Sequence, residues 1–537
     1  SPSALGIKQK RDDISYSGRM IAGMSGSSLN DVEGVCTFGN IRLTDSISSC
    51  LLGINSIVLT ASGESESREI KLRSDFVDLD LAGSYDVASI PATLQAIAAK
   101  KLPSLFNPLH GSDNISKNRF SISASIKETE SFADTFRLPA SLMYPMMISG
   151  HVDGSNLTAS LEIDAPYIRQ GNKLIENTSV KFNSDTVLAV LTAETKVPTK
   201  DGLMSINIDN TLVSDSAHTS INWSIDRKRA YNGKIGFSTG LSRLDDSQVV
   251  TAVNILPGEM EFNDTVWTVA PSSVTAYGKE RIIVDHLNVS RYGQFVRIDG
   301  AVSSSADDRL KIDLSNVNLD YIFESLGIDK ARIGGDATGT FTASALLSPE
   351  PHFTTSGLDV KNISYNATVL GNAIVKSSWD GERRAITLSA DIDQPNGKMS
   401  KIDGAIFPLN DSLDISFDAK EINIGFLKPF MEAFTSDVQG RASGQAHLWG
   451  NFKYIDFEGR LHADSIRMKI DFTNTWYTAC DSVIITPGLI DLHNITLRDE
   501  YNNTAMLNGY VKHTFFKAPE FEFNITDANH MLVYDET

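Results

Sequence analysis

The chain has 537 residues, of which 41% are hydrophobic and 21% are charged, a composition typical of an ordered, water-soluble protein. Its 67 acidic residues against 48 Lys and Arg give a formal charge of -19, which argues against nucleic acid as a partner and against electrostatic adhesion to an anionic membrane surface. The length exceeds one ordinary globular core, so several domains or one elongated repetitive structure are expected.

The first segment carries no recognisable export signal. Residues 1–20 lack the apolar core of a signal peptide, and no apolar run in the sequence approaches the length of a membrane span. The first residue is Ser rather than Met. We therefore expect the chain to be a fragment of a longer protein that carries an anchor or export signal upstream.

Apolar and polar residues alternate with a period of two along most of the chain. Clear examples are "FVDLDLAGSY", "FVRIDGAV", "LKIDLSNV", "SLDISFDA" and "FEFNITD". This alternation is the signal of half-buried strands, and the turn clusters between them, such as "GESES" and "QPNGK", are typical of antiparallel hairpins. The sequence therefore predicts a mostly β protein built from an antiparallel sheet.

Three short amphipathic helices are predicted, in chain order, at 89–102, 320–326 and 425–434. The first has Ser89 as N-cap and Pro91 in its first turn, with a stripe formed by Ile90, Leu94, Ile97 and Ala98. The second is capped by Asp320, and the third carries Phe and Leu residues at helical spacing. We expect each helix to pack one face on a sheet.

An internal repeat organises the second half of the chain. The pattern apolar, polar, Gly, any, apolar recurs around Gly300, Gly404 and Gly509, which are 104 and 105 residues apart, and a looser copy surrounds Gly83. An alternating strand follows the three later copies. The sequence therefore predicts a repeated β module.

The module boundaries are predicted from this repeat. We expect a β-rich segment over 1–110 that ends in a helix, a β-rich groove segment over 111–280, two β repeats with a short helix over 281–400 and 401–500, and a truncated repeat over 501–537.

Signatures of enzymes and metal centres are absent from the sequence. It has no HExxH, CxxC, GxSxG or P-loop motif, and its ten histidines are scattered. We predict no catalytic residue, no metal and no cofactor. We interpret Cys36 and Cys50 as buried thiols. The alternative is a disulfide between them across a hairpin.

One cluster of acidic residues and a histidine could be a metal or acid/base site. Asp491, His493, Asp499 and Glu500 lie within ten positions. Residues 285–302 match 491–511 if Asn288 is aligned with Asn494, yet this sister copy lacks the last two acids. We therefore interpret the cluster as a strand, a turn and a strand, with a metal or acid/base site as the alternative.

Apolar residues lie on one parity of every predicted strand. A long sheet with one apolar face must cover that face, either with a second sheet in a sandwich or by curling into a trough filled by acyl chains. The candidate groove residues are Leu79, Leu81, Val296, Ile298, Val302, Ile312, Leu314, Ile402, Ile406, Ile415, Phe417, Ile495, Leu507, Val511, Phe521 and Phe523.

Several of these segments carry a family resemblance. The runs "VDLDLAGSYD", "LGNAIVKSSWDGERRAITLSADID" and "TNTWYTACDSVIITPGLIDLHNITLRDEYNNTAMLNGYVKHTFF" resemble the TamB (translocation and assembly module) family of the Bacteroidetes type, within the AsmA-like group of bridge-like lipid transfer proteins. The resemblance covers most of the chain and is clearer from about residue 280 onward. Its motifs are β-repeat phrases, not a catalytic signature.

The resemblance implies a U-shaped groove of antiparallel strands, often called a β-taco. It implies a periplasmic protein anchored in the inner membrane that carries phospholipids to the outer membrane, with an Omp85-type barrel as partner through regions outside this chain. The alternatives are a scaffold for outer-membrane protein insertion and an extracellular β-solenoid adhesin or glycan-acting protein. A glycan-acting protein needs clustered carboxylates or exposed aromatic residues, which the sequence does not display.

Overall fold

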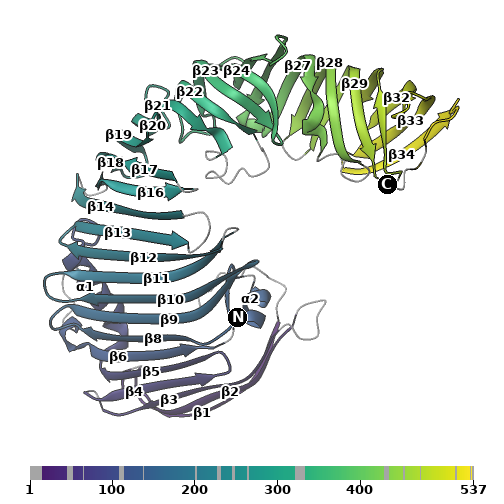
Figure 1. Cartoon of the computed structure of the whole chain (residues 1–537). Coiled ribbons are helices and arrows are strands. Elements are labelled where there is room, and N and C mark those ends of the chain that lie inside the picture. The colour runs from purple at the N-terminus through teal and green to yellow at the C-terminus, as the bar shows by residue number, and fades with distance from the viewer. Residues whose placement is uncertain are drawn as a thin grey trace. The chain divides into compact units, whose positions relative to one another are not determined.

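A computed structural model describes residues 15–534 apart from 29, 45–51, 65, 108–113, 128, 137, 200–201, 226–230, 245–247, 263–264, 321–332, 429–434, 452–453, 472, 515–516 and 533. Within the described residues, 34 strands belong to one antiparallel sheet, accompanied by two α-helices and a few 3₁₀ turns (Figure 1). The predicted mostly β fold, a long antiparallel sheet with few short helices, is confirmed. The chain divides into two compact units, Ser1–Gly278 and Lys279–Thr537.

In unit 1, each strand pairs with the next along the chain, as expected for a meander of hairpins. The exceptions are β6 and β7, which pair with β8 and β9 respectively, β14, which pairs with both β15 and β16, and β15, which pairs with β18. The strands are β1 (Ser15–Ser25), β2 (Glu33–Thr44), β3 (Leu52–Ser62), β4 (Arg68–Ser74), β5 (Val77–Ser84), β6 (Arg119–Ile126), β7 (Ser141–Leu142), β8 (Met146–Asp153), β9 (Thr158–Gln170), β10 (Lys173–Ser184), β11 (Ala189–Thr199), β12 (Gly202–Val213), β13 (Ser216–Ile225), β14 (Tyr231–Arg243), β15 (Val249–Ile255), β16 (Gly258–Phe262), β17 (Thr265–Val269) and β18 (Ser272–Tyr277).

Unit 2 repeats this meander. Within the described residues it is interrupted at β29, which pairs with both β30 and β31, and at β30, which pairs with β32. The strands are β19 (Arg281–Arg291), β20 (Gln294–Ser303), β21 (Arg309–Asn318), β22 (Ile333–Ser344), β23 (His352–Tyr365), β24 (Thr368–Asp380), β25 (Ala385–Asp393), β26 (Met399–Phe407), β27 (Ser412–Asn423), β28 (Thr435–Asn451), β29 (Tyr454–Ile470), β30 (Thr475–Ala479), β31 (Ser482–Thr486), β32 (Leu489–Arg498), β33 (Thr504–Thr514) and β34 (Lys517–Thr526).

Helix α1 (Ile90–Lys101) is the predicted helix at 89–102, and it packs on the apolar side of unit 1. Its Ile97 lies in a buried cluster with Tyr85, Phe120 and Val152. The prediction that Leu94 faces inward is wrong, since this side chain is 47% exposed. The buried residues of the helix include Thr93, Ile97 and Lys101 instead. Ser89 occupies the N-cap without a side-chain bond to the helix; its hydroxyl donates to the Asp86 carbonyl at 3.1 Å.

The other two predicted helices fall largely outside the described residues. The helix at 320–326 has only Asp320 within them. The helix at 425–434 begins as the 3₁₀ turn η5 (Ile424–Leu427), and residues 429–434 lie outside the described part. A helix that was not predicted, α2 (Glu130–Phe136), follows β6, and Figure 1 shows α1 and α2 near opposite ends of the unit 1 strands. Further 3₁₀ turns are η2 (Val87–Ser89), η3 (Ile115–Lys117) and η4 (Pro408–Asn410).

Bulges recur along unit 2, and five of them share one pattern of hydrogen bonding. At each of these five a residue other than glycine takes a positive φ of 50 to 54° and shifts the strand register. Its backbone N–H then donates to a side-chain oxygen on the neighbouring strand. The donor and acceptor pairs are His286 and Asp299 (3.0 Å), Asn316 and Thr338 (2.9 Å), Asn362 and Asn372 (3.0 Å), Glu421 and Ser443 (2.9 Å), and Asn494 and Asn508 (2.8 Å).

These hydrogen bonds at the bulges explain part of the repeated glycine pattern. In four of the five pairs the acceptor directly precedes a glycine, as Asp299 precedes Gly300 and Asn508 precedes Gly509. Gly300 has φ of +122°, and a Cβ there would lie 2.0 Å from the Arg309 carbonyl oxygen. The polar residue therefore accepts a hydrogen bond from the backbone N–H of the bulge residue, while the glycine lets the next strand approach closely.

The bulges also correct the alignment between the two sister hairpins. His286 and Asn494 are the equivalent bulge residues, because their N–H groups donate to Asp299 and Asn508 respectively. The alignment of Asn288 with Asn494 is therefore wrong by two residues. Sequence matching placed the two asparagines together because the bulge position accepts either His or Asn.

Cys36 is a buried free thiol on β2. Its cross-strand partner on β3 is Leu59, and Cys50 lies outside the described residues. The buried-thiol interpretation is confirmed for Cys36.

Candidate apolar binding face

An uninterrupted row of apolar residues crosses unit 2 from β19 to β34. Residues that pair directly across neighbouring strands point to the same face of a sheet, so the row can be followed pair by pair. We call it the unit 2 row: Val289, Val296, Leu314, Gly339, Leu358, Val375, Ala390, Ile402, Phe417, Ala446, Gly459, Ile485, Ile490, Val511 and Phe521. No polar side chain interrupts it.

Unit 1 carries a row of the same kind from β1 to β14. The unit 1 row consists of Ala22, Cys36, Leu59, Leu72, Leu79, Ala124, Ile148, Ile163, Val180, Ala193, Ile208, Ile221 and Ile235. A flanking row through Leu81 is apolar as far as Leu191 and then becomes polar at Asn210 and Thr219, whose side chains hydrogen-bond at 2.6 Å. The apolar face of unit 1 is therefore narrower toward β13.

Most residues one position along each strand are polar, Phe295 and Ile374 being among the exceptions, and these residues face the opposite side. Beside the unit 2 row run Asp391, Lys401, Asp418, Gln445 and Arg460, each paired with the next across a strand. Ion pairs such as Lys420 with Asp418 (2.9 Å) and, in unit 1, Lys181 with Glu162 (2.8 Å) lie on the strands as well. Each unit is thus a sheet with one apolar and one polar face.

The predicted groove residues fall on these apolar rows or directly beside them. Leu79 belongs to the unit 1 row, and Val296, Leu314, Ile402, Phe417, Val511 and Phe521 belong to the unit 2 row. The remaining predicted residues occupy flanking rows: Leu81 pairs with Ile122, Ile298 with Ile312, Val302 with Ile282, Ile406 with Leu413, Ile415 with Leu448, Ile495 with Leu507, and Phe523 with Gly509.

Exposure along the unit 2 row is intermediate. Leu314 and Ala390 are buried and Phe521 is 55% exposed, whereas the other members of the row are half-buried. Phe523 and Ile525, on the same strand as Phe521, are 41% and 53% exposed. An apolar surface of this length that keeps part of each side chain accessible is typical of a binding surface.

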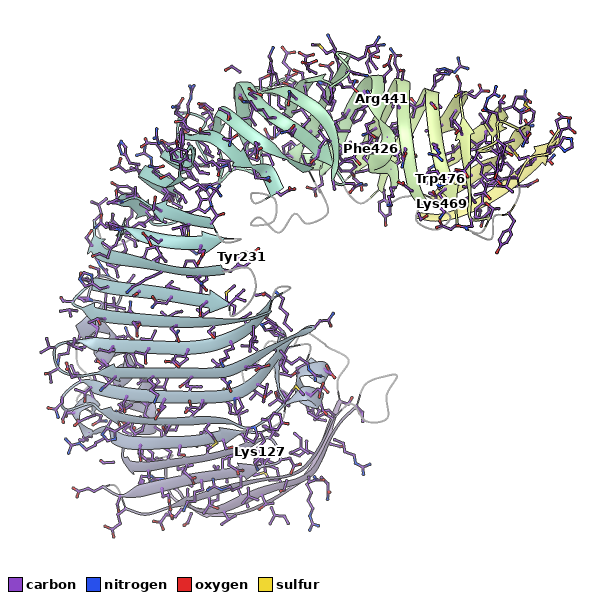
Figure 2. All side chains as sticks on the ribbon, in the orientation of Figure 1. Lys127, Tyr231, Phe426, Arg441, Lys469 and Trp476 are labelled. Atoms are coloured by element: carbon purple, nitrogen blue, oxygen red, sulfur yellow. The ribbon has the colours of Figure 1, made fainter. Side chains whose placement is uncertain are left out.

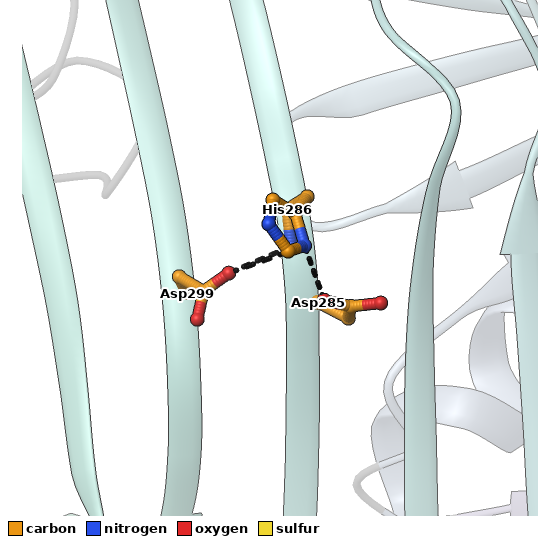
Figure 3. A group of neighbouring side chains, drawn as sticks. All are labelled: Asp285, His286 and Asp299. Carbon is orange, nitrogen blue, oxygen red and sulfur yellow. Dashed lines mark hydrogen bonds and ion pairs between the residues drawn. The ribbon is translucent and has the colours of Figure 1, made fainter.

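A second candidate site is the cluster of Asp285, His286 and Asp299 on the polar side of unit 2 (Figure 3). Among the described residues it is the one group of three whose potential metal-ligating atoms lie within 4.8 Å of one another. Sequence reasoning missed it, because the bulge and the hairpin bring these groups together. The three side chains are 61%, 82% and 55% exposed, and one Asp299 oxygen already accepts the His286 N–H.

The local chemistry of this cluster accounts for its geometry without a metal. The side chain of His286 hydrogen-bonds the Asp285 carboxylate and lies 3.5 Å from Asp299. The equivalent bulge at Asn494 has the same backbone bond, with amides of Asn494 and Asn508 in place of His286 and Asp299. The cluster is therefore a charged version of a repeated bulge, and it does not stand as our candidate site.

The cluster predicts a shifted histidine titration. The hydrogen bond to Asp285, its charge and that of Asp299 raise the pKa of His286 above 6.5. A histidine whose folded pKa is raised stabilises the fold fully below its unfolded pKa, and this contribution is lost as the pH rises through the folded pKa. We expect NMR titration to place the His286 pKa above that of an unfolded peptide, and Asp285→Asn to lower it. If Asp285→Asn left the pKa of His286 unchanged, this assignment would be contradicted. Asp403→Asn is the control variant, and it should leave the pKa of His286 unchanged.

The predicted strand, turn and strand over 490–509 is what the structure contains. Asp499 is 5% exposed and accepts the backbone N–H groups of Tyr501 (2.9 Å), Asn503 (2.8 Å) and Leu532 (2.8 Å). Burial alone would raise the pKa of Asp499, but these hydrogen bonds lower it. Its carboxylate thus shapes a turn.

The other three members of that segment act separately. Glu500 accepts from Arg467 at 2.9 Å, and Asp491 pairs across the strands with Tyr510. His493 is exposed. The four side chains do not form one of the ligand groups found in the described part of the chain.

Comparisons with known proteins do not assign this chain to a family. Within the described residues, no helix is both long and apolar enough to cross a bilayer. No protein-family model matches the sequence, and no curated protein matches it either. The apolar rows therefore carry the functional argument.

Proposed function

We propose that this chain is a non-enzymatic carrier of phospholipid acyl chains. One observation carries the proposal: each unit has a continuous row of apolar residues, most of them half-buried, thirteen in unit 1 and fifteen in unit 2, on the face opposite a charged one. Burial of one acyl methylene against such a surface contributes about 0.8 kcal/mol. A row across many strands therefore offers a path along which every position binds acyl chains.

The rows favour movement as well as binding. Neighbouring strands lie about 4.8 Å apart, and each strand presents an apolar residue at the same height. An acyl chain that advances by one strand exchanges one set of apolar contacts for an equivalent set, and no polar group on the row holds it back.

The cellular setting is proposed from the family resemblance. A TamB-like protein would use the rows as the floor of a trough in the periplasm and carry phospholipids from the inner toward the outer membrane. The phospholipids are the cargo, and an Omp85-type barrel is the expected protein partner. Direction, location and partner stay predictions of that resemblance.

Lipid extraction tests the proposal. We expect the chain purified in mild detergent to carry phospholipids that mass spectrometry detects. A photo-crosslinking amino acid at Ile402 should label lipid acyl chains, whereas the same amino acid at the adjacent Asp403 should not, because these residues face opposite sides of β26. Absence of phospholipid from the purified chain, or equal lipid labelling from both positions, would overturn the proposal.

A further inference from the structure

A cavity of about 520 Å³ lies at one end of the unit 2 strands. Three segments line it: the β23–β24 turn with Thr368, residues 423–428 with Lys428, and the start of β28 from Asp437 to Arg441. The β23–β24 turn and residues 423–428 are held together by Asn366, whose side chain donates to the Phe426 carbonyl at 3.0 Å. Phe426 and Arg441 are labelled in Figure 2.

The cavity joins the apolar and the polar face of the sheet. Val438 and Gly440 share the strand parity of Ala446, a member of the unit 2 row, whereas Gln439 and Arg441 have the opposite parity. Val438 is 3% exposed in a cluster with Ile424 and Ala442. The cavity therefore lies where the apolar face ends, about 27 Å along β28 from Ala446 at 3.4 Å per residue.

The charges around the cavity are unusual for this acidic protein. Two of its lining side chains, Lys428 and Arg441, are cationic and one, Asp437, is anionic. Nearby ion pairs join other groups, Lys398 to Glu421 (3.5 Å) and Lys420 to Asp418 (2.9 Å), and no ion pair among the described residues involves Lys428 or Arg441.

The hydrogen bonds leave these cationic groups available. Arg441 Nη1 donates to the neutral Glu421 carbonyl at 3.2 Å, which holds the guanidinium in place without neutralising it. Asp437 instead accepts from Gln439 Nε2 at 2.7 Å. A positioned guanidinium with an ammonium nearby matches the oxygens of a phosphate group.

We infer that this cavity binds the phosphate diester of a phospholipid head group whose acyl chains extend onto the apolar face of unit 2. This inference rests on the proposed function and deepens it, because it gives the carrier a means of selecting phospholipids over neutral lipids. The apolar row binds both classes of lipid equally, whereas Lys428 and Arg441 bind only the one that carries phosphate.

A competition between two lipids with identical chains tests the inference. The delipidated protein is incubated with vesicles that contain equal amounts of phosphatidylglycerol and diacylglycerol, re-isolated, and its bound lipids are measured by mass spectrometry. We expect about fivefold enrichment of phosphatidylglycerol on the unaltered chain. The double variant Lys428→Gln with Arg441→Gln should bind both lipids in equal amounts.

Two further variants separate charge from structure. Lys376→Gln with Arg460→Gln makes the same change in net charge at exposed positions on the polar face and should keep the enrichment. Lys428→Arg with Arg441→Lys keeps both charges and should also retain it. An unchanged lipid ratio in the Lys428→Gln, Arg441→Gln variant would overturn the head-group site, whereas absence of both lipids from every form would overturn the carrier function itself.

A soluble phosphate compound would use the same cationic groups. Isothermal titration with glycerol 3-phosphate distinguishes this source of phosphate from a head group. We expect it to bind at least tenfold more weakly than a short-chain phosphatidylglycerol, because it lacks the acyl chains. Equal affinity of the two would overturn the assignment to a lipid head group.

Discussion

Phe417→Asp is expected to lower the amount of phospholipid on the purified chain by about tenfold. Phe417 lies in the middle of the unit 2 row, between Ile402 on β26 and Ala446 on β28. The substitution removes apolar surface worth about 1.5–3 kcal/mol and places a charge where acyl chains would lie. Phosphorus analysis of the extracted lipid, normalised to protein, measures the effect.

Ser416→Asp is the matched control. It introduces the same charge one residue earlier on β27, on the opposite face, where Ser416 is exposed and pairs with Asp403 and His447. Repulsion from Asp403 should cost about 0.2–1 kcal/mol of stability but leave the bound lipid unchanged. Equal loss of lipid in both variants, or in neither, would show that the apolar row does not hold acyl chains.

Alternation in the sequence was sufficient to predict the fold class and the two faces. Side chains alternate across a strand, so Ile298 and Asp299 must face opposite sides whatever their neighbours are. The same reasoning placed Ile402 and Phe417 on the apolar side, and the structure pairs them directly. Local chemistry also located α1, because Pro91 and the basic residues at its end define both termini.

Register between strands could not be predicted in this way. The unit 2 row depends on fourteen pairings in succession, and a slip of one residue in any of them would break it. Bulges add to the difficulty, since three of the five residues that form them are asparagines but the other two, His286 and Glu421, are not. The same long-range pairings form the cavity at Arg441, which brings together segments about 70 positions apart.

Gly444→Ala is expected to destabilise unit 2 by more than about 2 kcal/mol. Gly444 has φ of +151°, and a Cβ built there would lie 2.1 Å from the Arg460 carbonyl oxygen on β29. An L-residue in this conformation costs about 1–3 kcal/mol, and the clash with backbone must in addition push β28 and β29 apart. Thermal unfolding and hydrogen exchange of the β28 and β29 amides measure the loss.

Gly357→Ala separates this effect from a general sensitivity of strand glycines. Its added Cβ would have the Ile374 Cγ2 as nearest atom at 3.7 Å, and Gly357 has no positive φ. We therefore expect a change of no more than about 1 kcal/mol, in the stabilising direction if the unfolded chain loses entropy. Gly444 lies two residues from Ala446 of the unit 2 row, so its substitution should also lower lipid binding, whereas equal stability of both variants would mean that β28 and β29 do not approach as closely as the structure places them.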